Sequence, residues 1–221
     1  MEGGWDLVNA AYEKPPRSTE QVMHPEKYVC GEEPVAVKLS IEQHEKPLYS
    51  DTMGEYYILL VIATKLGLNK AQVAAQGWGG DRLALYYNHA IDMWSVYWNI
   101  TWDSEQDARE FYQIFSDALM ETGATLTLDL GSRRVFSIWN YVVDISILGK
   151  NTLLEARAHT PDIRISQRLV EEFIGEHGEH VPIPEISHYN AVLGVRARYL
   201  REDWTLMLTW ILCIKGRKEI N

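Results

Sequence analysis

The residues whose types and spacing most resemble a metal site form a short histidine-rich segment in the last third of the chain. In Glu176-His177-Gly178-Glu179-His180, two imidazoles stand three positions apart beside two carboxylates. Imidazole and carboxylate groups are ligands of zinc, so His177 and His180 are candidate metal ligands. Gly178 and the prolines that follow favour a loop, and a solvated loop without metal is the alternative interpretation.

A second segment with unusual composition is Gly77-Trp78-Gly79-Gly80-Asp81-Arg82. Glycine-rich loops can bind phosphate, but this one carries Asp81 and lacks the Lys-Ser/Thr ending of a P-loop. The glycines give backbone freedom beside a large apolar anchor, which is typical of a structural junction. We therefore expect Trp78 to be buried, and Asp81 and Arg82 to bond each other or adjacent backbone.

Helical patterns precede this junction. Trp5, Val8 and Tyr12 have the spacing of one buried face of a short helix. Thr52 and Glu55 have the spacing of a capping box, which predicts a helix start there. Residues 32–50 contain prolines and scattered charge and are expected to form a surface connection, with residues 35–39 as the strand-like piece.

After Arg82 the apolar period changes from 3.6 to 2, which predicts strands. The strongest strand pattern places five residues on one face: Trp94, Val96, Trp98, Ile100 and Trp102. Asp103 and Gln106 have the spacing of a capping box for the next helix, which Gly123 ends.

Three or four strands are expected to follow, over residues 124–130, 133–139, 141–148 and 152–158, and then a helix over 160–174. Consecutive strands with short turns pair antiparallel. The predicted fold class is therefore α+β, with an N-terminal helical lobe followed by an antiparallel sheet with helices on one face, in the order β-β-α-β-β-β-α. The expected domains are a helical lobe over 1–80, a sheet lobe over 81–181 and a C-terminal hairpin extension over 182–221.

Composition limits the classes of partner. The chain has 21 Lys and Arg against 31 Asp and Glu, a formal net charge of −10. Such a charge repels nucleic acid and anionic membrane surfaces, so neither is an expected partner. The longest apolar run, 206–214, is too short to span a membrane, and the N-terminus has no signal-peptide pattern. Pairing of Cys30 with Cys213 is left open by their spacing, and the sequence leaves the oligomeric state undecided.

Several short motifs occur in the same order as in a known family. They are Gly3-Gly4-Trp5, Ala10-Ala11-Tyr12, Pro15-Pro16, Ser18-Thr19-Glu20-Gln21, His24-Pro25-Glu26-Lys27-Tyr28, Gly54-Glu55, Gly77-Trp78-Gly79-Gly80-Asp81-Arg82 and Trp102-Asp103 with Asp107-Ala108 and Phe111. Over residues 3–120 the chain resembles the C-terminal half of a family of putative zinc metallopeptidases of bacterial and archaeal surface proteins and lipoproteins. The resemblance implies an extracytoplasmic location.

The family's zinc site rests on a His-Glu-x-x-His helix, and this sequence contains no such motif. Two functions follow from the resemblance. The favoured one is a non-catalytic scaffold or protein-interaction domain that binds a protein partner or a preceding segment of the same polypeptide and needs no cofactor. The alternative is half of a zinc peptidase, whose metal-binding helix comes from an upstream segment or a partner chain.

The resemblance also implies auxiliary roles for two residues of the His-Pro-x-x-Tyr segment. His24 would hold the oxyanion of a tetrahedral intermediate beside the zinc, and Tyr28 would donate to the same oxygen. The alternatives are a helix-end histidine bonded to backbone and a tyrosine whose hydroxyl is bonded locally.

Overall fold

A computed structural model of the protein describes residues 4–39, 46–138 and 141–159. The helices in these ranges are α1 (Gly4–Glu13), α2 (Thr19–Met23), α3 (Pro25–Cys30), α4 (Glu55–Leu66), α5 (Leu68–Ala75) and α6 (Glu105–Glu121). The strands are β1 (Tyr49–Asp51), β2 (Trp78–Asn88), β3 (Met93–Trp102), β4 (Thr125–Asp129), β5 (Arg133–Ile138), β6 (Tyr141–Leu148) and β7 (Asn151–His159).

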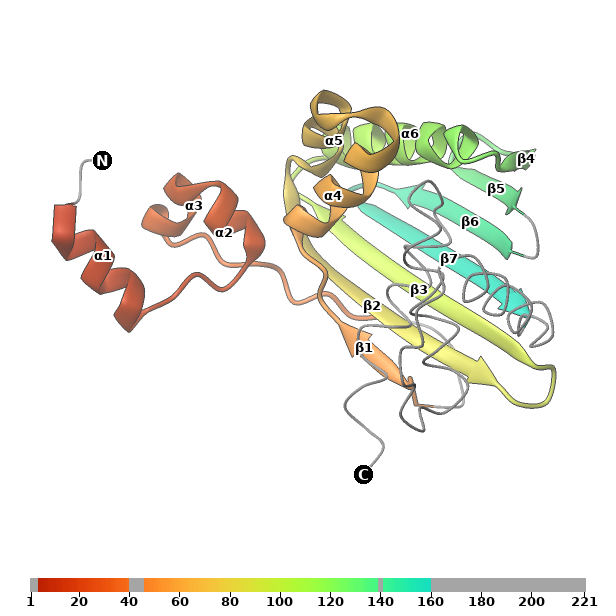
Figure 1. Cartoon of the computed structure of the whole chain (residues 1–221), viewed down its shortest axis with the longest axis horizontal. Helices are drawn as coiled ribbons and strands as arrows, with labels where there is room; N and C mark the ends of the chain where they lie inside the picture. The colour runs from red at the N-terminus through yellow and green to blue at the C-terminus, as the bar shows by residue number, and fades with distance from the viewer. Residues whose placement is uncertain (1–3, 40–45, 139–140, 160–221) are drawn as a thin grey trace, which may run out of the picture.

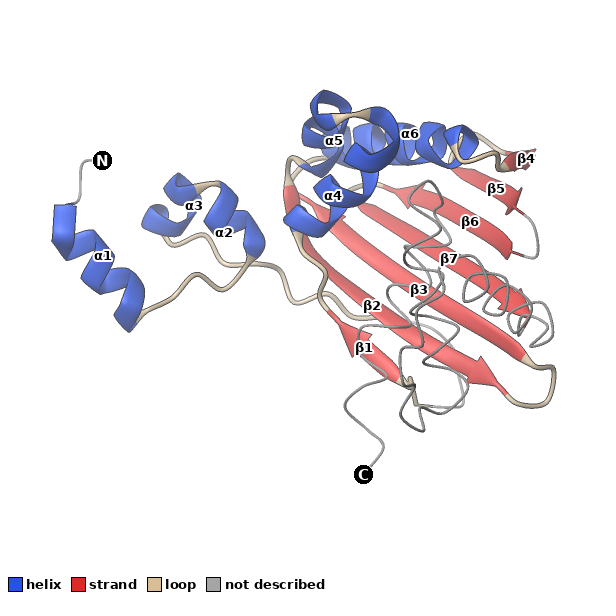
Figure 2. Ribbon diagram, in the orientation of Figure 1, coloured by secondary structure: helices blue, strands red, loops and turns tan. Residues whose placement is uncertain are grey.

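The strands form one antiparallel sheet in the order β1-β2-β3-β7-β6-β5-β4. Short connections join four of the strand pairs: β2–β3, β4–β5, β5–β6 and β6–β7. Strand β1 pairs with β2, from which α4 and α5 separate it in sequence, and β7 pairs with β3 in the middle of the sheet. Helices α4, α5 and α6 lie together on one face of the sheet (Figures 1 and 2). We use the name sheet lobe for β1–β7 with α4–α6. The predicted α+β class, with helices on one face of an antiparallel sheet, is confirmed.

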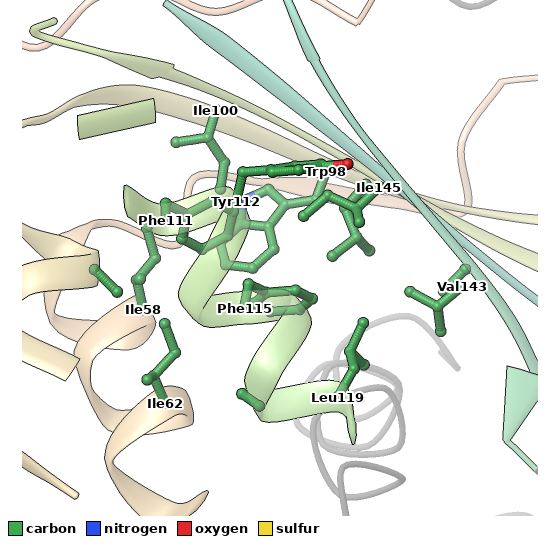
Figure 3. Close-up of a cluster of buried hydrophobic side chains, with 14 of the residues drawn as sticks. Ile58, Ile62, Trp98, Ile100, Phe111, Tyr112, Phe115, Leu119, Val143 and Ile145 are labelled. Atoms are coloured by element: carbon green, nitrogen blue, oxygen red, sulfur yellow. The ribbon is translucent and has the colours of Figure 1, made fainter. Parts of the chain in front are cut away.

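The core lies between this sheet face and helices α4, α5 and α6 (Figure 3). The alternating pattern of β3 is confirmed, because Trp98, Ile100 and Trp102 are almost completely buried. The Phe111 ring of α6 lies 4.8 Å from the Trp102 ring and 5.2 Å from the Phe115 ring, measured between centroids. Aromatic side chains bury large apolar areas, so this layer supplies much of the driving force for folding.

Helix α6 begins one residue later than the sequence pattern predicts. Ser104, and not Asp103, is its N-cap, and Asp107 completes the capping box in place of Gln106. The Ser104 hydroxyl accepts a hydrogen bond from the Asp107 amide at 3.2 Å, and the Ser104 amide donates to the Asp107 carboxylate at 2.9 Å. The prediction at Asp103 was wrong because Ser104 and Asp107 have the same spacing and equal chemistry. The Asp103 side chain is thus available for another contact.

The expected buried face of α1 is also wrong. Trp5 and Tyr12 are 81% and 85% exposed, and Val8 is exposed as well. Figure 1 shows α1 apart from the sheet lobe, so these side chains do not pack on the apolar surface of the described sheet lobe. The spacing predicted the helix correctly but could not show whether a partner surface lies against it.

Before β2, the strand-like piece of the expected surface connection forms no strand, and the predicted capping box is wrong. Residues 35–39 are not a strand, although the Val35 amide donates to the Gly79 carbonyl at 2.7 Å. The capping box at Thr52 and Glu55 does not form, since Gly54 is the N-cap of α4 and makes no side-chain cap. The Thr52 hydroxyl donates instead to the Asp81 carbonyl oxygen at 3.1 Å.

Some predictions fall outside the described residues. They are the helix over 160–174, the hairpin extension over 182–221, and Cys213, whose pairing with the exposed Cys30 the sequence left open. The divisions between the three expected domains stay predictions. Among the helices of the described ranges, none combines the length and hydrophobicity needed to cross a membrane.

Candidate functional site

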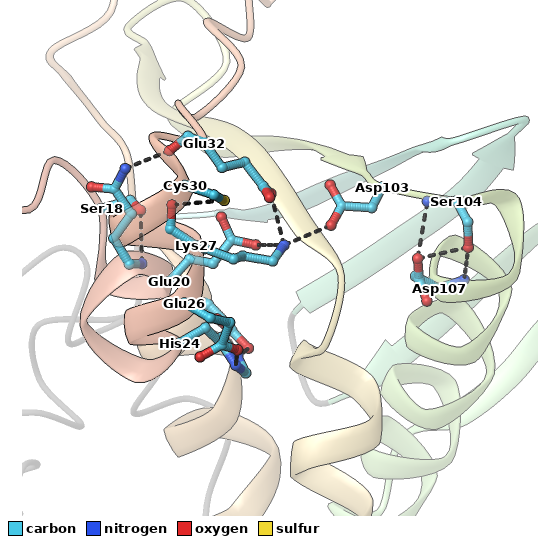
Figure 4. Close-up of polar contacts among 12 residues, drawn as sticks. Ser18, Glu20, His24, Glu26, Lys27, Cys30, Glu32, Asp103, Ser104 and Asp107 are labelled. Carbon is cyan, nitrogen blue, oxygen red and sulfur yellow. Dashed lines mark hydrogen bonds and ion pairs between the residues drawn. The ribbon is translucent and has the colours of Figure 1, made fainter. Parts of the chain in front are cut away.

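Charged side chains of α2 and α3 meet those of α4 and of the β3–α6 junction in one group (Figure 4). We call this group the polar cluster and define it by six residues: Glu20, His24, Lys27, Glu32, Glu55 and Asp103. It joins the N-terminal helices to the sheet lobe. It also contains the largest concentration of buried charge in the part of the chain that the structure describes.

Local sequence fixes the geometry of α2 and α3. The Ser18 hydroxyl caps α2 by accepting a hydrogen bond from the Gln21 amide at 3.2 Å. Pro25 begins α3 and disfavours helical geometry at the residue before it, so α2 ends at His24. His24 therefore stands at the break between two short helices, where its side chain can reach a neighbouring element.

Gly54 permits the close approach of α2 to α4. Its φ of +82° lies in the region that favours glycine, and a side chain there would collide with the Thr19 hydroxyl. The Thr19 hydroxyl in turn accepts a hydrogen bond from the Tyr56 amide at 3.3 Å. This contact brings the start of α2 to the first turn of α4, which begins at Glu55.

His24 and Glu55 form the first half of the polar cluster. The His24 Nε2 lies 2.9 Å from Oε1 of Glu55, whose side chain is buried, while His24 is one-third exposed. The second oxygen of Glu55, Oε2, is buried and has no hydrogen-bond partner among the described residues. Burial raises the pKa of Glu55, although the hydrogen bond to His24 opposes this, and the same bond raises the pKa of His24.

Lys27 is the centre of the other half. Its ammonium nitrogen lies 2.6 Å from a Glu20 oxygen, 2.8 Å from a Glu32 oxygen and 2.8 Å from an Asp103 oxygen. Burial alone would lower the pKa of Lys27, but the three carboxylates raise it above its ordinary value. Burial raises the pKa of Glu20, which is nearly inaccessible. Lys27 thus joins α3 to the loop after it and to the start of α6.

This arrangement has the donor set of a cation site. One oxygen each from Glu20, Glu32 and Asp103 lie within 4.8 Å of one another, and the Lys27 ammonium is bonded to all three residues. A zinc site normally uses imidazole or thiolate ligands. Here the one imidazole is bonded to Glu55, so the cluster by itself does not fit a zinc ion. It fits an ammonium group, which Lys27 provides.

The predicted junction contains a second buried carboxylate, Asp81. It accepts hydrogen bonds from the indole nitrogens of Trp78 and Trp98 at 3.0 and 2.9 Å. It also accepts from the backbone amides of Met53 and Gly54 at 2.9 and 2.8 Å. Asp81 therefore ties the start of α4 to β2 and β3, directly behind the polar cluster.

The expected burial of Trp78 is confirmed, since it is 1% exposed. The bonding of Asp81 to backbone is also confirmed, but no ion pair joins it to Arg82 among the described residues. Gly80 packs so closely on the Val35 backbone that a side chain would collide with it. The junction is thus a packing point built from strand residues rather than a loop.

The other predicted site residues are not brought together. The Tyr28 hydroxyl donates to the Lys14 carbonyl oxygen at 2.6 Å, whereas His24 is bonded to Glu55. The oxyanion roles of His24 and Tyr28 stay predictions. His177 and His180 lie outside the described residues.

Five members of the polar cluster were not predicted as site residues: Glu20, Lys27, Glu32, Glu55 and Asp103. Glu55 and Asp103 were each given a capping role, and helix ends offer that role to every carboxylate nearby. The available signal was that all of these residues except Glu32 lie in the motifs on which the family resemblance rests. The structure shows that those motifs contact one another.

Comparison with known proteins gives one match. Searches of curated proteins and of solved structures each found nothing that matches the chain. The profile of a domain of unknown function, DUF8575, matches residues 21–145, which include His24, Lys27, Glu55, Asp81 and Asp103. Its description assigns no activity, so the resemblance to zinc metallopeptidases stays a prediction. Because the match covers more than half of the sequence, the chain belongs to the family defined by the domain of unknown function DUF8575.

Proposed function

We propose that this protein is a non-catalytic scaffold and protein-interaction domain whose α1 helix binds a protein partner. The observation that carries the proposal is the exposure of Trp5 and Tyr12, at 81% and 85%, on a helix that stands apart from the sheet lobe (Figure 1). Tryptophan and tyrosine are the residues most enriched at the energetic centres of protein interfaces.

Charge indicates the chemistry of that partner. Helix α1 carries Asp6 and Glu13 and no basic residue, within a chain of net charge −10. Electrostatic complementarity favours a partner surface with an apolar groove and Lys or Arg at its rim. That surface belongs to a separate protein or to a preceding segment of the same polypeptide.

The sheet lobe and the polar cluster act as the support for α1. Tyr28 of α3 donates a hydrogen bond to the carbonyl oxygen of Lys14, immediately after α1. Lys27 and His24 then connect α3 and the end of α2 to the sheet lobe. A bound partner would therefore be held at a defined place relative to the sheet.

Site-specific photo-crosslinking tests the proposal. A crosslinking amino acid at Tyr12 should capture one defined polypeptide in cells, whereas the same residue at Leu148, which is 84% exposed on the sheet lobe, should not. The captured protein, once purified, should bind the wild-type chain and bind the Trp5→Ser/Tyr12→Ser variant at least about tenfold more weakly. Equal capture at both positions, or equal affinity for both chains, would overturn the proposal.

A second candidate function has one observation in its favour. Glu55 is buried with an unpartnered oxygen and a bond to the partly exposed His24, and such perturbed groups concentrate at functional sites. On this alternative the chain is half of a zinc peptidase, and an upstream segment or partner chain brings the metal ligands.

Zinc analysis and peptidase assays separate the two candidates. The scaffold proposal predicts that the purified chain hydrolyses no unfolded protein in the presence of zinc, alone or with a candidate upstream segment. Hydrolysis that appears with the added segment, and disappears in the Glu55→Gln variant, would establish the second candidate. The Glu26→Gln variant is the control, because Glu26 is 74% exposed and lies 3.6 Å from the other nitrogen of the same imidazole.

A further inference from the structure

A pocket of about 490 Å³ lies between α6 and the turns that follow β4 and β6. Its walls include Arg109, Tyr112 and Gln113 of α6, Arg134 of β5, and Ser132 and Ile147. No carboxylate is among the residues that line it. In a protein of net charge −10, this pocket has a positively charged lining.

Arg134 is held in place with donors to spare. Its Nε donates to Asp129 at 3.1 Å and its Nη1 donates to Gln113 at 3.0 Å, while the guanidinium lies 5.0 Å from the centroid of the Tyr112 ring. Its side chain is 18% exposed. The Nη2 group has no partner among the residues that the structure describes, so it can donate to a ligand.

Arg109 provides a second, more mobile guanidinium. Its side chain is 65% exposed and makes one contact of 3.3 Å with Glu105, a spacing at which an exposed ion pair contributes little. Two guanidinium groups from different elements therefore face one pocket. Planar guanidinium groups match the geometry of carboxylate and phosphate oxygens, which they bind through paired hydrogen bonds.

Tyr112 adds an apolar wall and an unsatisfied group. The residue is 5% exposed, and its buried hydroxyl has no hydrogen-bond partner among the described residues. A buried tyrosine hydroxyl normally has such a partner. Ile147 lies on the same wall. The pocket thus combines positive charge with an apolar surface, beside a buried hydroxyl that has no partner among the described residues.

We propose that this pocket binds a small organic anion, with its carboxylate or phosphate group on Arg109 and Arg134 and its apolar part against Tyr112 and Ile147. Its volume falls in the range of about 300–1,000 Å³ that is typical of small-molecule sites, so an inorganic ion alone would not fill it. This site is separate from α1 and does not depend on the function proposed above.

Titration of the full chain with simple aromatic anions tests the proposal. The probes are benzoate for a carboxylate ligand, phenyl phosphate for a phosphate ligand, and benzamide as the neutral control, followed by amide chemical shifts in nuclear magnetic resonance spectra. We expect saturable shifts at residues 109–113 and 131–134 with at least one anion and none with benzamide. The anion that binds more tightly identifies the class.

Matched variants assign the contact. Arg109→Gln should weaken binding about tenfold, as expected for the loss of one charge-assisted hydrogen bond. Arg17→Gln should leave it unchanged, since Arg17 is 67% exposed and has one acidic partner, as Arg109 does. Tyr112→Phe reports whether the hydroxyl contributes. An absence of saturable shifts with both anions, equal binding of benzamide, or equal affinity of the Arg109→Gln and wild-type chains would overturn the proposal.

Discussion

The buried residues of α6 and those of α2 are of opposite kinds. Helix α6 buries seven residues, six of them apolar or aromatic, against the sheet. Helix α2 buries Glu20 and Gln21, and α3 buries no residue completely. Among the described residues of α2 and α3, Met23 is the one that packs against the hydrophobic core cluster.

The two regions should therefore respond to different conditions. Apolar contacts in the sheet lobe scale with buried area and are insensitive to pH and salt. The contacts of α2 and α3 are ion pairs whose strength depends on protonation and screening. Apolar packing therefore stabilises the sheet lobe, whereas ion pairs hold the α2–α3 segment against it.

The largest effect is expected in the sheet lobe. Phe111→Ala removes the ring that contacts Trp98, Trp102 and Phe115, and should lower the free energy of unfolding by about 3–5 kcal/mol. Urea unfolding followed by circular dichroism measures it. Leu148→Ala, at a residue that is 84% exposed, is the control and should change stability by less than about 0.5 kcal/mol. Similar values for the two variants would remove the distinction between the regions.

Asp81→Asn tests the hydrogen bonds through which Asp81 joins the start of α4 to β2 and β3. The amide nitrogen of asparagine would face indole or backbone donors, so part of the four-donor set would lose its acceptor. We expect a loss of about 2–3 kcal/mol, since hydrogen bonds to a buried charge are strong. Arg82→Gln, next in sequence, makes none of these bonds and should stay within about 0.5 kcal/mol. An equal effect of the two variants in the same urea assay would contradict the role of Asp81.

Lys27→Met should loosen α2 and α3 without unfolding the sheet lobe. It leaves the carboxylates of Glu20, Glu32 and Asp103 without their shared cation. Because Glu32 and Asp103 are partly exposed, we expect a loss of about 1–2 kcal/mol, less than for a fully buried pair. Hydrogen exchange of residues 19–30 should accelerate, while that of residues 105–121 should not. Lys14→Met is the control; matching exchange in both variants would exclude Lys27 as the attachment.

The smallest effect is expected from pH. The pKa of His24 is raised by its bond to Glu55, so the stabilisation is complete below the ordinary histidine pKa and is lost as pH rises through the raised value. Burial also raises the pKa of Glu55, so ionisation of this carboxyl group likewise lowers the stability of the folded chain as pH rises. Between about pH 6 and about pH 8, exchange of residues 19–30 should therefore accelerate modestly. Lys27, Glu26 and Asp103 also act on this pair.

The control for the pH experiment is His24→Gln. This variant keeps a hydrogen-bond donor near Glu55 but cannot gain a proton. Its exchange should depend less on pH than that of the wild-type chain. An equal pH dependence would assign the effect to another group.

The sequence predicts the sheet lobe well because its determinants are local. The alternation in β3 and the apolar stripe of α6 each lie within one element, and both are confirmed. Even the one-residue error at the start of α6 concerns two adjacent residues, Asp103 and Ser104, that are both favoured as helix N-caps. The buried Trp78 was also predictable, since a large apolar side chain between glycines has few other places to pack.

The polar cluster could not be predicted in the same way. His24 and Glu55 are 31 positions apart, and Lys27 and Asp103 are 76 positions apart. Each of these residues also has an ordinary local role at a helix end, and nothing in the spacing says which role applies. Similarly, the pattern of α1 predicts an apolar face but not that this face is exposed.

Hydrogen exchange at two salt concentrations tests the difference between the regions most directly. Raising the salt from about 0.05 M to about 1 M shortens the screening length and should weaken the contacts of Lys27. Residues 19–30 should exchange about fivefold faster at high salt, equivalent to about 1 kcal/mol, while residues 94–119 should not change. Exchange of residues 19–30 that is independent of salt would contradict the attachment by charge.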